Sequence, residues 1–127
     1  MIEIKENPLL GSGFDAMHTF ENWKVAFITA APQYEALQVF KRHLLTDEAF
    51  VLTQGQATIY TISDDNKTLE ETVMLPQCVY VVKKATWHHV QVSKDALLVV
   101  IENSNTTKEN TEQITLEEWK NSKETTI

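Results

Sequence analysis

The chain has 127 residues, 43% of them hydrophobic, and a formal net charge of −7. This length suits one domain with a single core. The acidic balance argues against a nucleic-acid-binding protein, because phosphate backbones are held by clustered lysine and arginine, and the only such clusters are residues 41–42 and 83–84.

The amino-terminal segment predicts neither a secretory signal nor a membrane span, because its first ten residues include two glutamates and no long apolar run. We therefore expect a cytoplasmic protein. Residues 1–15 hold a proline and two glycines, which predicts a loop-rich lead-in with a short edge strand at 2–5.

Short segments with strand-like alternation or β-branched composition then follow one another, with turn residues between them. They are residues 23–29, 36–43, 48–52, 56–62, 68–75, 78–83, 87–93 and 96–102. Many short strands with little helix between them predict an all-β sandwich or barrel.

Two of these segments carry more specific expectations. Trp23, Val25 and Phe27 alternate with Lys and Ala, which is typical of a half-buried strand. Residues 78–83 are almost continuously apolar, which predicts a strand buried on both faces. The single cysteine, Cys78, has no partner for an internal disulfide and is expected to pack as a small buried apolar residue.

The carboxy-terminal part turns polar. Residues 103–110 contain no apolar side chain, so the barrel is expected to end near 103. Thr115 and Glu118 form a capping-box pattern that opens a short helix over 116–123, and Trp119 on its apolar face is expected to dock on the barrel.

The most informative stretch is residues 40–60, F-K-R-H-L-L-T-D-E-A-F-V-L-T-Q-G-Q-A-T-I-Y. Alternation along the first strand places Lys41 and His43 on one face together with apolar residues. Alternation along the second strand directs Glu48 toward apolar neighbours in the same way. Gly55 then supplies the conformational freedom that a tight turn requires.

This stretch resembles the first motif of the cupin superfamily, in which H-x-H, four residues, E, six residues and G carry metal-binding side chains. In that pattern His43 is the second histidine, Glu48 the glutamate and Gly55 the glycine, and the spacing fits without gaps. Lys41 stands where the family usually has its first histidine.

Residues 83–88, K-K-A-T-W-H, resemble the second cupin motif, P-x-G-x-x-H, which ends on a metal-binding histidine. Lys83 replaces the proline and Ala85 replaces the glycine. His88 also shares a strand face with Val90, which independently directs it inward. The resemblance covers roughly residues 23–103.

The resemblance implies a cupin-type double-stranded β-helix, a jelly-roll barrel, with a short carboxy-terminal helix. On this basis we expect a lead-in over 1–18, a barrel over about 19–103, and a polar linker and helix over 104–127. It also implies a homodimer, in which the lead-in and the strand at 96–101 are the expected shared surfaces.

For the site, the resemblance implies a divalent transition metal, namely iron, manganese, nickel or zinc, held by His43, Glu48 and His88. Lys41 is the candidate catalytic residue that would move a proton. The residues expected to contact a small polar ligand are Trp87 and Phe50.

Lys41 leaves three alternatives open, because its ammonium group would repel a nearby dication. Its long side chain could reach the barrel mouth and leave a three-ligand metal site. It could instead replace the metal by pairing with Glu48 and offering a cation to an anionic ligand. The pocket could also be an inactive remnant.

The corresponding functions are a metal-dependent isomerase, dioxygenase or lyase acting on a small polar molecule, a metal-free module that binds an anion or sugar, and a structural dimeric barrel.

Overall fold

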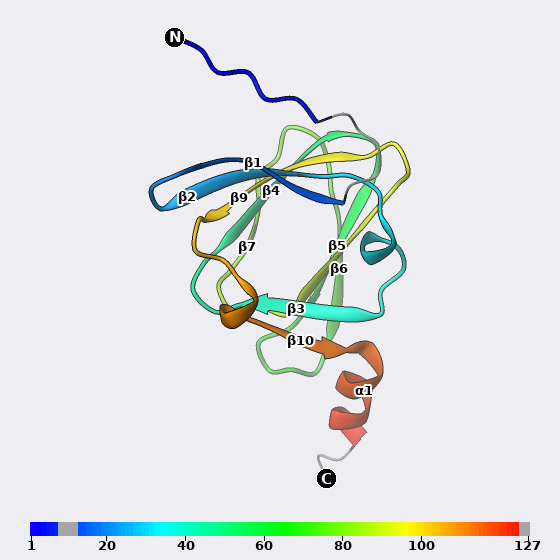
Figure 1. Ribbon diagram of the computed structural model, residues 1–127. Coiled ribbons are helices and arrows are strands. Elements are labelled where there is room, and N and C mark those ends of the chain that lie inside the picture. The colour runs from blue at the N-terminus through cyan, green and yellow to red at the C-terminus, as the bar shows by residue number, and fades with distance from the viewer. Residues whose placement is uncertain (8–12, 125–127) are drawn as a thin grey trace.

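The structure is a computed structural model that describes residues 1–7 and 13–124. The strands in this part of the chain form two five-stranded antiparallel sheets (Figure 1), ordered β1-β2-β9-β4-β7 in the first sheet and β10-β3-β8-β5-β6 in the second. Their bounds are β1 (Phe14–Phe20), β2 (Trp23–Ile28), β3 (Val39–His43), β4 (Glu48–Gln54), β5 (Ala57–Ile62), β6 (Leu69–Val73), β7 (Tyr80–Val82), β8 (His88–Val92), β9 (Leu97–Asn103) and β10 (Thr111–Thr115).

The chain crosses repeatedly between the two sheets. After β2 it enters the second sheet at β3 and returns to the first sheet at β4. It then forms the β5–β6 hairpin in the second sheet and alternates between the sheets again from β7 to β10. The two sheets face each other across the barrel, as Figure 1 shows. This architecture is the double-stranded β-helix that the sequence motif predicted, and the helix α1 (Leu116–Glu124) follows the last strand.

The main core lies between the sheets, where alternate residues of each strand point inward. Phe50, Leu98 and Val100 of the first sheet are 1%, 0% and 0% exposed. Ile59 and Val90 of the second sheet face them and are 3% and 4% exposed. Burying these apolar side chains is the main source of stability for the barrel.

The strand β2 turns the face with Ala26 and Ile28 toward the core, and the face with its large apolar residues outward. Ala26 and Ile28 are buried, whereas Trp23 is 42% exposed. The neighbouring strand β9 fixes this orientation, because Ala26 pairs with the buried Val100. The larger side chains of β2 therefore form an apolar outer surface on the first sheet.

The expectation of a strand at 78–83 buried on both faces is wrong. Only Tyr80–Val82 form β7, which is the edge strand of the first sheet. Val79 and Val81 are 66% and 49% exposed, and Cys78 is exposed as well. The outer face of this sheet is not covered at β7, so alternate residues of the strand face solvent, and composition alone does not reveal it.

The lead-in also differs from its expectation. Residues 2–5 form no strand, and Ile2 and Ile4 are exposed. The first strand is β1, which pairs with β2 along its length through a bulge between Ala16 and His18. No helix in the described part of the chain is long and apolar enough to cross a membrane.

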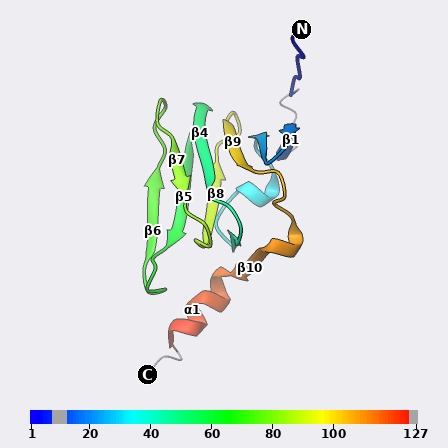
Figure 2. The ribbon, with the colours of Figure 1, turned by 90° about the vertical axis from the view of Figure 1, so that its left-hand side faces the viewer.

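The helix α1 is capped as predicted. The Thr115 hydroxyl accepts the Glu118 amide N–H at 3.0 Å, and the Glu118 carboxylate accepts the Thr115 amide N–H at 3.0 Å. Trp119 is 3% exposed and lies edge-on to Phe40, with ring centroids 6.0 Å apart. The helix therefore docks on the outer face of the second sheet, at the end of the molecule away from the amino terminus (Figure 2).

Candidate metal and ligand site

The candidate site lies at one end of the barrel, where the inward-facing residues change from apolar to polar. In the second sheet, His88 pairs with Lys41 on one side and with Thr61 on the other. In the first sheet, Lys24 pairs with Glu102, and Glu48 pairs with Val82. Paired residues of antiparallel strands point to the same face, so these side chains form one polar layer across the barrel. We use the name polar layer for the polar members of this set, which are Lys24, Lys41, Glu48, Thr61, His88 and Glu102.

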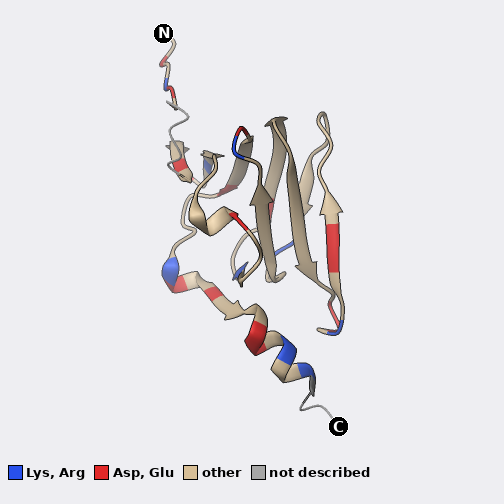
Figure 3. Ribbon diagram, turned by 90° about the vertical axis from the view of Figure 1, so that its right-hand side faces the viewer, with Lys and Arg blue, Asp and Glu red and all other residues tan. Residues whose placement is uncertain are grey.

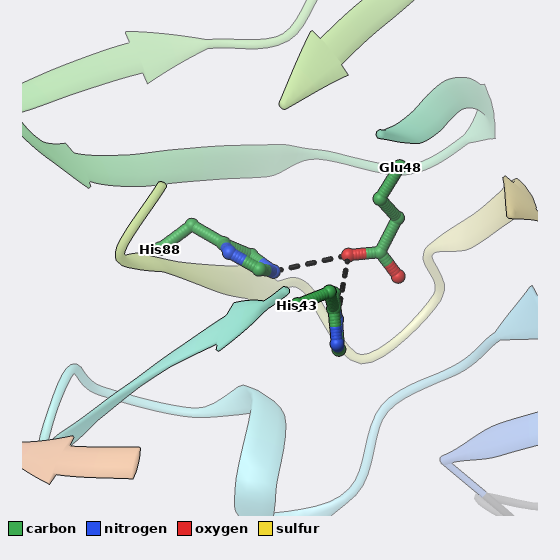
Figure 4. Close-up of side chains that lie close together, drawn as sticks. All are labelled: His43, Glu48 and His88. Atoms are coloured by element: carbon green, nitrogen blue, oxygen red, sulfur yellow. Dashed lines mark hydrogen bonds and ion pairs between the residues drawn. The ribbon is translucent and has the colours of Figure 1, made fainter. Parts of the chain in front are cut away.

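Three predicted residues come together at the centre of the polar layer. His43 is the last residue of β3, Glu48 is the first of β4 and His88 is the first of β8, so all three lie at strand ends. Both imidazole rings approach the same carboxylate oxygen (Figure 4), with Glu48 Oε1 at 3.2 Å from His43 Nε2 and 3.0 Å from His88 Nε2. One ligand atom from each residue lies within 4.8 Å of the others.

The second ring nitrogen of each histidine, Nδ1, also has a hydrogen-bond partner. His88 Nδ1 lies 3.0 Å from the Thr86 carbonyl oxygen, which only accepts, so Nδ1 carries the proton. His43 Nδ1 lies 2.9 Å from the Thr111 hydroxyl of β10. These contacts fix both rings with Nε2 directed at Glu48. Metal-binding histidines are commonly oriented by such bonds from the other nitrogen.

The charges in this cluster depend on one another. Burial would raise the pKa of Glu48, but the hydrogen bonds from His43 and His88 outweigh it and hold the pKa below its ordinary value. Burial would lower the pKa of His88, but the hydrogen bond and the negative charge of Glu48 raise it. The cluster thus favours a charged carboxylate beside a positively charged partner.

These residues fit a divalent transition metal. Two imidazole nitrogens and one carboxylate oxygen are the donor set preferred by iron, manganese, nickel and zinc, and three protein ligands leave coordination positions open for a small molecule.

The structure adds Glu102, which the sequence motifs did not single out. Glu102 is 5% exposed and shares a hydrogen bond with Glu48. Burial, together with the bond and charge of Glu48, raises the pKa of Glu102 to about 8. Lys24, with its Nζ 3.8 Å from Glu102 Oε2, opposes this shift without cancelling it, so Glu102 holds the proton of the carboxyl pair near neutral pH. Its alternation with Leu98 and Val100 on β9 is the sequence signal that could have revealed it.

Tyr34 is a second addition. It belongs to a short 3-10 turn, Pro32–Tyr34, between the two sheets, and it packs against the main core. Burial and the charges of Glu48 and Glu102 raise the pKa of its hydroxyl. The hydroxyl therefore stays protonated and is a neutral donor beside the carboxyl pair.

The other predicted site residues are placed differently from one another. Phe50 is 1% exposed and its ring lies 6.3 Å from that of His88, so it forms the floor beneath the cluster. Lys41 is exposed, on the same strand face as His88. Trp87 packs with the outer cluster of Phe40 and Trp119. Trp87 thus lies outside the group of side chains brought together here, and its role in ligand binding stays a prediction.

The turn before His88 explains the glycine of the second cupin motif. Ala85 replaces this glycine and adopts a φ of 64°, in the left-handed region where a side chain is unfavourable. The turn is kept by the Ala85 amide N–H, which donates to the His43 carbonyl oxygen at 2.8 Å. This bond joins the two histidine-bearing segments directly.

The carboxyl pair gives the stability a defined pH dependence. Glu102 has a pKa of about 8 in the folded chain against an ordinary value of 4.5, so between these values only the folded chain keeps the proton. The free energy of unfolding of the metal-free protein should therefore fall as pH rises, by up to about 1.4 kcal/mol per pH unit. The raised pKa of His88 acts in the same direction above pH 6.5. Glu102→Gln, which keeps a donor but does not ionise, should reduce this slope in denaturant titrations at pH 5.5 and 8 with a chelator present.

The matched control is Glu117→Gln on the exposed face of α1, which should leave the slope unchanged. Equal slopes for the wild type and Glu102→Gln would show that Glu102 is ionised in the folded protein and would contradict its assignment as the proton carrier.

No protein-family model matches the chain, and no curated protein matches it. Solved structures do. A nucleoside dehydratase of Streptomyces matches with a TM-score of 0.59 and 12% identity, over 77% of this chain and 72% of the other. An RmlC-like cupin family protein from Methanocaldococcus jannaschii matches with a TM-score of 0.59 and 14% identity, over 81% and 92%. A TDP-fucose-3,4-ketoisomerase from Campylobacter jejuni matches with a TM-score of 0.56 and 18% identity, over 73% and 68%. The chain therefore has the double-stranded β-helix fold of the cupin superfamily, as its two motifs predicted.

Proposed function

We propose that this protein binds a divalent transition metal through His43, Glu48 and His88, and a small polar molecule beside it. The observation that carries the proposal is the convergence of three ligand atoms within 4.8 Å. The bonds that hold the outer nitrogen of each histidine support it, because they direct both Nε2 atoms to the same point.

A metal in this position would act as a Lewis acid on an oxygen of the ligand. The surrounding residues supply the proton chemistry. Glu102 holds a proton on its carboxyl group beside Glu48, and the exposed Lys41 carries an ammonium group on the strand face that it shares with His88. This set suits an isomerase or lyase, in which a proton is moved next to a polarised oxygen. Among the similar structures are a dehydratase and a ketoisomerase. A dioxygenase is the alternative reaction for the same ligand set.

The metal proposal predicts a stoichiometry. Protein purified without chelators or an affinity metal should contain close to one equivalent of a single transition metal, measured by elemental mass spectrometry. The double variant His43→Ala, His88→Ala should contain only background metal, because two of three ligands are lost. The control His18→Ala removes a partly exposed histidine of β1, which is not a member of the cluster, and should keep the metal. Full metal in the double variant would mean that the ions bind elsewhere.

One observation favours a second candidate, a metal-free anion site. The negative charge of Glu48 is already compensated by hydrogen bonds from both histidines, so the carboxylate does not need a dication as a partner. Lys41 lies in the same polar layer and could then attract the anionic group of a ligand. Lys24 is engaged elsewhere, because its Nζ donates to the Thr106 carbonyl oxygen at 3.3 Å and lies 3.8 Å from Glu102 Oε2.

Lys41→Ala separates the two candidates. Removing the ammonium group should tighten Zn²⁺ binding roughly threefold to tenfold if a dication occupies the site, because a like charge is lost and the exposed lysine is partly screened. The same change should weaken phosphate binding if Lys41 anchors an anion. Both affinities are measured by calorimetric titration, with Lys120→Ala on α1 as control. Unchanged Zn²⁺ and phosphate affinities would remove Lys41 from either site.

We further propose a homodimer through the outer face of the first sheet. The outward residues of its central strands are apolar, with Val25 and Phe27 on β2, Val99 and Ile101 on β9, and Val51 on β4. Ile101 is 48% exposed at the centre of this surface. A large apolar surface on a chain of net charge −7 suits an identical uncharged surface, as in an isologous interface.

Ile101→Glu should convert the dimer to a monomer, because the interface would bury an unpaired charge from each copy. Val73→Glu is the matched control, since Val73 is 67% exposed at the edge of the second sheet. Sedimentation velocity at about 100 µM gives the masses. A monomeric wild type, or a dimeric Ile101→Glu variant, would rule out this interface.

A further inference from the structure

A second feature lies one strand away from Glu48 and His88, neither of which lines it. A cleft of about 380 Å³ lies between the edge strands β6 and β7, and its walls include Ile59, Thr61, Glu70, Thr72, Tyr80 and Val82. This volume is in the range of small-molecule sites. The cleft opens between the β5–β6 turn, which contributes Asp64, and the β7–β8 turn, which contributes Lys83.

The cleft continues the polar layer. Thr61 is the direct partner of His88, and Glu70 is the direct partner of Thr61. On the facing sheet, Val82 is the direct partner of Glu48. The walls of the cleft therefore begin one strand away from two of the proposed metal ligands, because neighbouring strands are about 5 Å apart.

The walls combine an apolar and a hydroxyl-bearing surface. Ile59 and Val82 are 3% and 7% exposed and give a rigid apolar floor. Tyr80 is fixed by its hydroxyl oxygen, which accepts the Leu75 amide N–H at 2.8 Å. The threonines of β5 and β6 add hydroxyl groups, which donate and accept hydrogen bonds.

The charges of the cleft select against anions. Glu70 and Asp64 contribute two carboxylates to the lining. Lys83 is the lysine that lines the cleft, and its Nζ is bound to the Asp47 carboxylate at 2.6 Å. Figure 3 shows the acidic stretch in the edge strand β6. The local field is thus negative, and a carboxylate such as Glu70 accepts strong hydrogen bonds from ligand hydroxyls.

We propose that this cleft binds a neutral polyhydroxylated molecule of monosaccharide size, with Glu70 accepting its hydroxyl groups, and presents it to the metal-binding residues. The inference deepens the proposed function, on which it rests, by naming the class of the small polar ligand. It also places the ligand on the β6–β7 side of the polar layer, away from Lys41 and Lys24.

The test is a two-dimensional amide NMR titration of the full chain with D-ribose and D-glucose as neutral probes and D-ribose 5-phosphate as the charged probe. At least one neutral sugar should shift the amides of Thr61, Glu70, Thr72 and Val82. Glu70→Gln should weaken that sugar fivefold to tenfold, because a charged acceptor is replaced by a neutral one. Glu71→Gln changes the neighbouring residue, which points to the opposite face of β6, and should have no effect.

Several results would overturn the proposal. These are the absence of shifts at the four amides with both neutral sugars, tighter binding of the phosphorylated sugar, and equal losses in the Glu70 and Glu71 variants. The metal is measured separately by elemental analysis, so the two ideas fail independently. Sugar shifts in a protein without metal would keep the cleft and reject the metal site, whereas bound metal without sugar shifts would do the reverse.

Discussion

The site depends on one buried carboxylate. Glu48 is 5% exposed, and a charge removed from water is costly unless it is paired. The pairing comes from His43 and His88, which approach one oxygen from two strands of the opposite sheet. Each histidine is in turn held by a threonine, Thr111 in β10 and Thr86 in the turn before β8. The need to compensate one charge therefore fixes the geometry at the ends of four strands.

The apolar core of the barrel supplies the stability that offsets the cost of burying these charged groups. Below the polar layer, inward residues such as Phe50, Leu98 and Ile59 are almost completely buried and hold the two sheets together. Because stability comes from these apolar layers, the end of the barrel can keep a destabilising carboxyl pair. Strained or costly groups of this kind gather at functional sites in other proteins. Glu102 beside Glu48 is such a group, and it lies next to one of the three proposed metal ligands.

The strand period of two predicted an all-β barrel and directed His43, Glu48 and His88 inward, beside apolar neighbours. The double-stranded β-helix and the choice of these three residues as a site came from the resemblance to the two cupin motifs. Glu102 follows the same alternation but belongs to neither motif. The strand β10 was missed because, over Thr111–Thr115, only Ile114 is apolar. Burial of Cys78 was predicted wrongly, since an apolar run does not reveal whether its strand lies at the centre or the edge of a sheet. The position of a strand in its sheet depends on pairing between segments that are distant in the sequence.

The position of Lys41, where the cupin motif usually has a histidine, can be understood from the distribution of charge across the polar layer. Lys41 and Lys24 lie toward its β2 and β3 side, whereas Thr61 and Glu70 lie toward β6. The histidine and glutamate cluster stands between a basic and an acidic end. Lys41, whether it repels a metal ion or attracts an anion, acts at the basic end of the layer. The cleft with Glu70 lies at the acidic end. Neither role of Lys41 therefore conflicts with a neutral group bound at Glu70. A ligand that spans the layer would place its central atoms at Glu48, beside the proton on Glu102.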